Sequence, residues 1–123
     1  MVLDLSGAAD EVVKRYALDQ LPLDRRTRTS ADLLRLDGKL ALVTGGGGDG
    51  LGAAICERLA EQGADIAVLD VSETAAATTV TSLAERWNLR AEQLLADVAD
   101  REQVGTAVDG LLERKGRIDI LVN

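Results

Sequence analysis

The sequence predicts an α/β fold in three layers, with helices on both faces of a parallel sheet. Short apolar runs of the kind found in strands buried on both faces alternate with segments whose apolar residues recur at helical spacing. The connections between these segments are short, so each strand–helix–strand unit is expected to form a right-handed crossover between parallel strands.

Residues 1–36 are expected to form a helical extension ahead of the sheet. Apolar residues recur at helical spacing after Ser6, which predicts a short amphipathic helix over about residues 8–18. An arginine-containing run follows with acidic residues on both sides, so we interpret it as a solvated linker rather than an anion-binding patch. Ser30 is a candidate N-cap for a short turn through Leu34.

Residues 37–123 are expected to form the sheet domain, which begins at the Asp37-Gly38 turn signal. The predicted strands cover residues 40–43, 66–69, 93–96 and 118–122. The helices between them carry typical end signals: Gly63 and Gly116 at C-termini, Ser72 as an N-cap, and an Asp100–Gln103 capping box.

The composition excludes several classes of site and partner. The 123 residues include no histidine and a single cysteine, Cys56, so we expect no metal site and no internal disulfide. A net charge of −7 with only Tyr16 and Trp87 as aromatic residues argues against nucleic-acid partners. No apolar run approaches the roughly 18–20 residues of a membrane span. The acidic start also lacks the basic region of a signal peptide, so we expect a cytoplasmic protein without membrane contact.

A glycine-rich segment, residues 44–52, lies where the first predicted strand leads into a helix. Glycines there permit a tight turn and let backbone N–H groups approach a pyrophosphate, which a helix N-terminus also favours. The next strand ends at Asp70, whose carboxylate can accept hydrogen bonds from both ribose hydroxyls of an adenine nucleotide. The pattern predicts a dinucleotide site, with a plain flexible turn as the alternative. The candidate cofactor residues of the loop are Gly45, Gly46, Asp49, Gly50, Leu51 and Gly52.

The charge around this site favours NAD over NADP. A 2′-phosphate would meet the like charge of Asp70, and the next residues, Val71-Ser72-Glu73, supply no arginine. Asp49 places a second negative group inside the loop. The alternatives are a strand-end cap for Asp70 and a cap on the following helix for Asp49.

Residues 36–123 resemble the N-terminal half of the short-chain dehydrogenase/reductase family. The resemblance rests on six segments in order: Leu36-Asp37-Gly38-Lys39, Thr44-Gly45, Gly50-Leu51-Gly52, Val68-Leu69-Asp70, Ala96-Asp97-Val98 and Ile118-Asp119-Ile120-Leu121-Val122-Asn123. It implies a Rossmann-type half with strand order 3-2-1-4, truncated after the fourth strand. It also implies hydride transfer between NAD and a small alcohol or carbonyl substrate, with Gly50 and Leu51 lining the pyrophosphate.

The same resemblance implies roles for residues beyond the loop. Asp70 would hold the adenosine ribose, and Asp97 would approach the adenine amino group with Val98 packed beside it. Asn123 would be the first residue of the family's Asn-Asn-Ala-Gly segment.

The glycine loop departs from the family pattern in its length. The family has three residues between the Thr-Gly pair and Gly-x-Gly, whereas four residues separate Gly45 from Gly50 here. Either Gly46 takes the role of the first glycine or the loop bulges. Since glycine tolerates both arrangements, backbone strain need not prevent binding.

The catalytic residues of the family are a second departure. The sequence stops at Asn123, ahead of the family's catalytic Ser and Tyr-x-x-x-Lys, and Tyr16 is followed four residues later by Gln20. A tyrosine proton donor needs a lysine nearby to lower its pKa. We therefore expect the 123 residues to bind cofactor without dehydrogenase activity and name no catalytic residue.

Three other interpretations stay open at this stage. The chain could be a non-catalytic NAD-binding module, an inactive remnant, or a methyltransferase-like domain that binds S-adenosylmethionine. The fourth strand would be an open edge rich in isoleucine and valine beside an uncovered sheet face, so self-association is expected.

Overall fold

The computed structural model of the chain describes residues 29–123. The chain divides into two compact units, residues 1–34 and residues 35–123, and each is described by itself. The helix expected over residues 8–18 and the arginine-containing run lie outside the described residues.

The described part of the first unit is the short helix α3 (Ser30–Leu33). Its N-cap is Thr29, whose hydroxyl accepts a hydrogen bond from the Asp32 amide at 3.2 Å. The Asp32 carboxylate accepts in return from the Thr29 amide at 2.8 Å, which completes a capping box. The prediction of Ser30 as the N-cap was wrong by one residue. Both reciprocal hydrogen bonds with Asp32 are made by Thr29.

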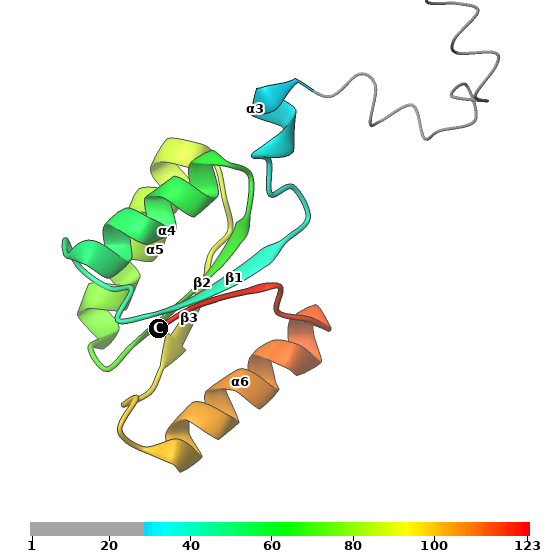
Figure 1. The fold of residues 1–123 in the computed structure, drawn as a ribbon. Helices are drawn as coiled ribbons and strands as arrows, with labels where there is room; N and C mark the ends of the chain where they lie inside the picture. The colour runs from blue at the N-terminus through cyan, green and yellow to red at the C-terminus, as the bar shows by residue number, and fades with distance from the viewer. Residues whose placement is uncertain (1–28) are drawn as a thin grey trace, which may run out of the picture. The chain divides into compact units, whose positions relative to one another are not determined.

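The second unit is a four-stranded parallel sheet of order β3-β2-β1-β4, with α4 and α5 on one face and α6 on the other (Figure 1). The predicted α/β class and strand order are confirmed. The elements, in chain order, are β1 (Leu40–Thr44), α4 (Leu51–Glu61), β2 (Asp65–Asp70), α5 (Glu73–Trp87), β3 (Glu92–Leu95), α6 (Arg101–Lys115) and β4 (Ile120–Val122).

The two central strands are buried on both faces because their side chains alternate between two apolar layers. In β1, Ala41 and Val43 join the layer that α4 and α5 cover, and Leu40 and Leu42 join the layer that α6 covers. The fully buried Leu111 attaches α6 to this second layer. Helices packed on both faces hold the sheet in place. The loops at the carboxyl ends of its strands are therefore held in place as well.

The helix ends follow the predicted local chemistry. Gly63 and Gly116 adopt positive φ angles of 94° and 79° directly after the C-terminal turns of α4 and α6. Asn88, which tolerates this conformation better than most residues, ends α5 in the left-handed region. Ser72 caps α5 through a hydrogen bond from the Ala75 amide at 3.3 Å.

The edge strands differ from prediction at their ends. β3 covers residues 92–95 rather than 93–96. β4 begins at Ile120 rather than residue 118, because the Asp119 carboxylate takes the Leu40 amide at 2.8 Å ahead of the ladder. That hydrogen bond, with Arg117 and Lys39 nearby, lowers the pKa of Asp119 below its usual range.

Within residues 29–123, no helix combines the length and apolar character that crossing a membrane requires. The same residues contain no group of three or more side chains placed to hold a metal ion.

Candidate functional site

The predicted site residues gather at one edge of the sheet, where the carboxyl ends of parallel strands meet. The glycine loop follows β1, and Asp70 is the last residue of β2. Asp97 and Val98 follow β3, and Asn123 follows β4. Hydrogen bonds join these ends: the Ala96 amide donates to the carbonyl of Asp70 at 3.1 Å. In an open α/β sheet this edge is where ligands bind.

The glycine loop is fixed to its neighbours by three consecutive amides, those of residues 46–48. They donate to the Leu69 carbonyl at 3.3 Å, the Asp70 carboxylate at 3.0 Å and the Ala75 carbonyl at 2.8 Å. These amides are therefore directed into the protein, toward β2 and α5, and are occupied there.

The extra residue of the loop is accommodated as a bulge toward α5. Gly45 makes the tight turn at a φ of +60°, and a Cβ atom on Gly52 would collide with its carbonyl oxygen. Gly45 and Gly52 thus keep the close approach between the end of β1 and the start of α4. At Gly47, a Cβ atom would lie 2.7 Å from backbone atoms of Ala75 and Ala76, so the bulge packs backbone to backbone on α5.

The N-terminus of α4 carries no side-chain cap. Its N-cap residue is Gly50, whereas Thr29, Ser72 and Asp100 cap the other helices of the described part of the chain. Asp49 is exposed and does not cap α4, contrary to the alternative considered for it. The first N–H groups of a helix have no intrahelical partner, so α4 presents free donors and a positive dipole end. This arrangement suits an anion such as a pyrophosphate.

Asp70 is oriented by two backbone amides. Its carboxylate accepts from Gly47 at 3.0 Å through one oxygen and from Ser72 at 2.9 Å through the other. An ionised carboxylate offers about four acceptor positions, so about two remain for hydroxyl groups of a ligand. Beside it, the apolar side chain of Val71 is 69% exposed.

Asp97 lies in a turn that Gln103 closes. The Gln103 amide oxygen accepts from the Asp97 backbone at 3.1 Å, and its NH₂ group donates to Asp100 at 2.9 Å. Asp100 caps α6 as predicted, but Gln103 bonds to Asp97 instead of completing the predicted capping box. The backbone N–H of Gln103, followed by its side chain, lowers the pKa of Asp100 below its usual range.

Asn123 is connected to the end of β1. The hydroxyl of Thr44 donates to the Asn123 side-chain oxygen at 3.0 Å, which ties the ends of β1 and β4 together. No local pattern in the sequence predicts this hydrogen bond, because the two residues are 79 positions apart.

The single cysteine has a packing role beneath the loop. Cys56 is fully buried on α4, and a Cβ atom on Gly46 would lie 3.2 Å from its sulfur. Burial raises the pKa of the thiol to about 11, so it stays protonated at neutral pH. A protonated, buried thiol is a poor nucleophile.

The predicted residues line two separate cavities rather than one. Asp49 and Gly50 line a cavity of about 310 Å³ between α4 and α5. Val98 and Asn123 line another of about 340 Å³, walled mostly by apolar side chains between α6 and the sheet. Asp70 lines neither cavity.

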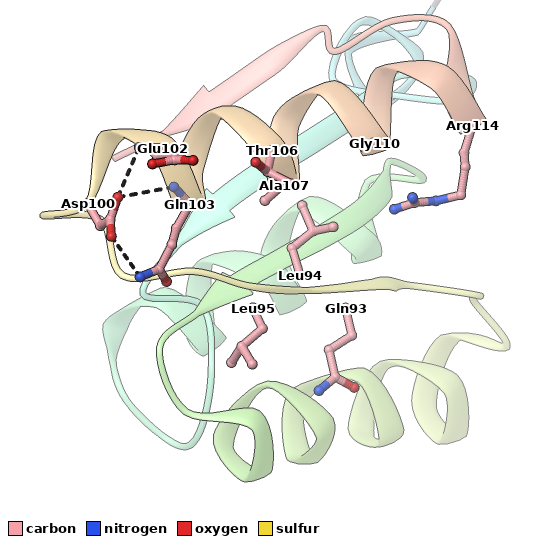
Figure 2. A pocket seen from close by; sticks show the side chains of 10 residues that line it. All are labelled: Gln93, Leu94, Leu95, Asp100, Glu102, Gln103, Thr106, Ala107, Gly110 and Arg114. Atoms are coloured by element: carbon pink, nitrogen blue, oxygen red, sulfur yellow. Dashed lines mark hydrogen bonds between the residues drawn. The ribbon is translucent and has the colours of Figure 1, made fainter.

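A third hollow, of about 430 Å³, lies between β3 and α6 (Figure 2). Asp100 and Gln103 line one end of it and Arg114 the other, and Leu94 faces it from β3. None of the predicted cofactor residues lines this groove. Arg114 is already paired there with Glu92 at 3.2 Å.

Comparison with known proteins identifies the family. The family model described as short chain dehydrogenase matches residues 39–123, which is more than half of the chain. The chain belongs to the short-chain dehydrogenase family. The resemblance inferred from the motifs is confirmed.

Individual short-chain dehydrogenases show the same relationship. D-threitol dehydrogenase of Mycolicibacterium smegmatis is 44% identical over 90 residues, covering 72% of this chain and 34% of the relative. The structure of L-sorbose reductase from Gluconobacter frateurii, complexed with NADPH and L-sorbose, matches with a TM-score of 0.67 at 33% identity. That match covers 73% of this chain and 34% of the reductase.

An NAD⁺-bound xylitol dehydrogenase is also similar, with a TM-score of 0.65 at 39% identity over 69% of this chain and 32% of that one. The chain thus spans about a third of the length of the short-chain dehydrogenases it matches. These two solved structures contain different cofactors, NADPH in the reductase and NAD⁺ in the xylitol dehydrogenase.

The close approach between Gly45 and Gly52 yields a prediction with a matched control. Gly52→Ala should lower the free energy of unfolding by about 1–3 kcal/mol, because the new methyl group overpacks against a backbone carbonyl. Gly50→Ala adds its methyl group in open space and should cost less than about 1 kcal/mol. Urea denaturation of the two variants checks this. Equal stabilities would contradict the described loop geometry.

Proposed function

We propose that this chain binds NAD at the carboxyl edge of the sheet. It would serve as the cofactor-binding part of an oxidoreductase that transfers hydride between NAD and an alcohol or carbonyl compound. The observation that carries the proposal is the uncapped N-terminus of α4 behind a glycine loop fixed to Asp70. Free helix donors and a carboxylate at the end of the next strand are the two groups that a dinucleotide needs.

The pyrophosphate and the adenosine half of the cofactor each have a partner in this arrangement. The pyrophosphate would take the amides of residues 50–52, since those of residues 46–48 are occupied inside the protein. The adenosine ribose would hydrogen-bond to the remaining acceptor positions of Asp70. Asp97 would accept from the adenine amino group, with exposed Val71 and Val98 against the faces of the base.

The preference for NAD over NADP rests on this chain's own charges, because similar proteins with either cofactor are known. Asp70 ends β2, Glu73 begins α5 three residues later, and Asp49 lies in the glycine loop. A 2′-phosphate on the ribose bound at Asp70 would meet like charge, which costs free energy, and the segment after β2 supplies no arginine to offset it. Family membership favours a dinucleotide over S-adenosylmethionine, the alternative that the loop and Asp70 alone had left open.

We assign the 123 residues to cofactor binding rather than to the proton transfer that accompanies hydride transfer. The sequence contains a single tyrosine, Tyr16, and the residue four positions later is Gln20 rather than lysine. A general acid with a lowered pKa is therefore not supplied by a Tyr-Lys pair of this chain. The proposed substrate class, an alcohol or carbonyl compound, follows from membership of the family.

The first test is a calorimetric titration of the chain with NAD and with NADP. We expect saturable binding of NAD and at least roughly tenfold weaker binding of NADP, about the effect of one unfavourable charge contact. Asp70→Ala should weaken NAD binding by roughly 10- to 100-fold, since it removes hydrogen bonds to a charged group. Asp65→Ala, at the opposite end of the same strand, should leave NAD binding unchanged.

Three results would contradict the proposal in different ways. A folded chain that binds neither dinucleotide lacks the function proposed here. Equal affinities for NAD and NADP would contradict the proposed preference for NAD, while the proposed binding site would stand. An Asp65→Ala effect as large as that of Asp70→Ala would mean that the loss reflects general destabilisation.

We also propose that the 123-residue chain self-associates through the β4 edge. β4 is the outer strand of the sheet, and Leu121 at its centre is 65% exposed. An unpaired apolar strand edge pairs readily with another chain.

Sedimentation equilibrium tests this second proposal. We expect a concentration-dependent rise in mass that Leu121→Lys reduces, since an edge lysine opposes strand pairing. Leu112→Lys places the same charge on exposed α6 and should not change the association. A monomer at every concentration, or an equal effect of both variants, would contradict the proposed edge.

A further inference from the structure

Thr79 is the one fully buried polar residue in the part of the chain that the structure describes, with 2% of its surface exposed. It lies on α5, and its hydroxyl donates to the carbonyl of Gly48 in the glycine loop at 3.4 Å. One helical turn earlier, the Ala75 carbonyl accepts from the Gly48 amide at 2.8 Å. Both backbone polar groups of one loop residue, Gly48, are therefore held by α5.

The packing beneath these hydrogen bonds leaves no room for a side chain. The Gly47 backbone lies so close to Ala75 and Ala76 that a Cβ atom there would be 2.7 Å from their main-chain atoms. The bulge that carries the extra loop residue thus rests directly on α5. At the next residues the chain turns into Gly50 and α4, whose N-terminus has no side-chain cap.

A loop of four consecutive glycines has many accessible conformations, and ordering it on binding would cost free energy. Contacts that fix the loop in the free protein reduce this cost and so increase affinity. Two of these contacts come from Asp70 and β2, and the others come from α5. The side chain that supplies the α5 contact is Thr79.

We propose that Thr79 is a positioning residue for the dinucleotide: its hydroxyl holds the lengthened glycine loop on α5 so that the amides of residues 50–52 face the pyrophosphate. The inference rests on the proposed function, since it assigns this loop to the pyrophosphate. Thr79 is buried beneath the loop and acts only through Gly48.

The position of Thr79 predicts which part of a ligand senses its loss. Adenosine lacks the pyrophosphate and would contact only Asp70, Asp97 and the apolar side chains near them. NAD would also need the ordered loop. Loss of the Thr79 hydroxyl should therefore weaken binding of NAD but not of adenosine.

The experiment is an NMR titration of the 123-residue chain and its variants with NAD and with adenosine. Thr79→Val keeps the branched shape without the donor and should raise the Kd for NAD by roughly two- to tenfold, the range of one hydrogen bond. The Kd for adenosine should stay the same. Thr79→Ser restores a hydroxyl and should recover most of the NAD affinity.

Three further variants separate this role from folding. Thr78→Val makes the same change at the neighbouring position of α5. The Thr78 hydroxyl donates to the Thr74 carbonyl within the helix, so this variant should leave NAD binding unchanged. Gly47→Ala displaces the loop from α5 by steric contact and should also weaken NAD binding. Gly105→Ala, in open space on α6, is its control. Thermal melts of all variants establish that they fold.

Each outcome bears on a different claim. If the parent chain binds NAD and folded Thr79→Val binds it equally well, the inference is wrong while the proposed function stands. Equal losses for NAD and adenosine would also overturn the positioning role. If the parent chain binds neither ligand, the proposed function fails and the inference fails with it.

Discussion

The structure of the site depends on one steric constraint: the carbonyl of Gly45 lies where any side chain on Gly52 would have to be. This contact brings the end of β1 against the start of α4, and so places the free amides of the helix at the carboxyl edge of the sheet. An anion at that edge is favoured both by unpaired N–H groups and by the helix dipole. Moving the helix away would remove both effects, however well the rest of the sheet were packed.

The extra loop residue is compatible with this constraint because it is taken up elsewhere. The bulge at residues 47–48 leaves the approach of Gly45 to Gly52 intact and makes hydrogen bonds to α5 and Asp70. The Asp70 carboxylate thereby has two tasks, since it fixes the loop and retains acceptor positions for a ligand.

The sequence predicted the features that depend on local pattern. The buried runs of β1 and β2, the strand order and the end of α4 at Gly63 were confirmed. The contacts of Thr79 with Gly48 and of Thr44 with Asn123 were not predictable, because they join residues 31 and 79 positions apart. The predicted start of β4 was wrong for a similar reason. The Asp119 carboxylate accepts a hydrogen bond from the Leu40 amide, which the strand ladder would otherwise use. Gln103 was recognised as a capping residue, but its bond to Asp97 depends on how the turn closes.

We propose that the start of α4 and the end of β2 form one binding site for NAD. The change in backbone amide chemical shifts of the isotope-labelled chain on addition of NAD tests this proposal. We expect the largest changes at Gly50, Leu51 and Gly52, with further changes at Asp70 and Asp97. Changes centred instead on the groove between β3 and α6, at Thr106 and Gly110, would contradict it.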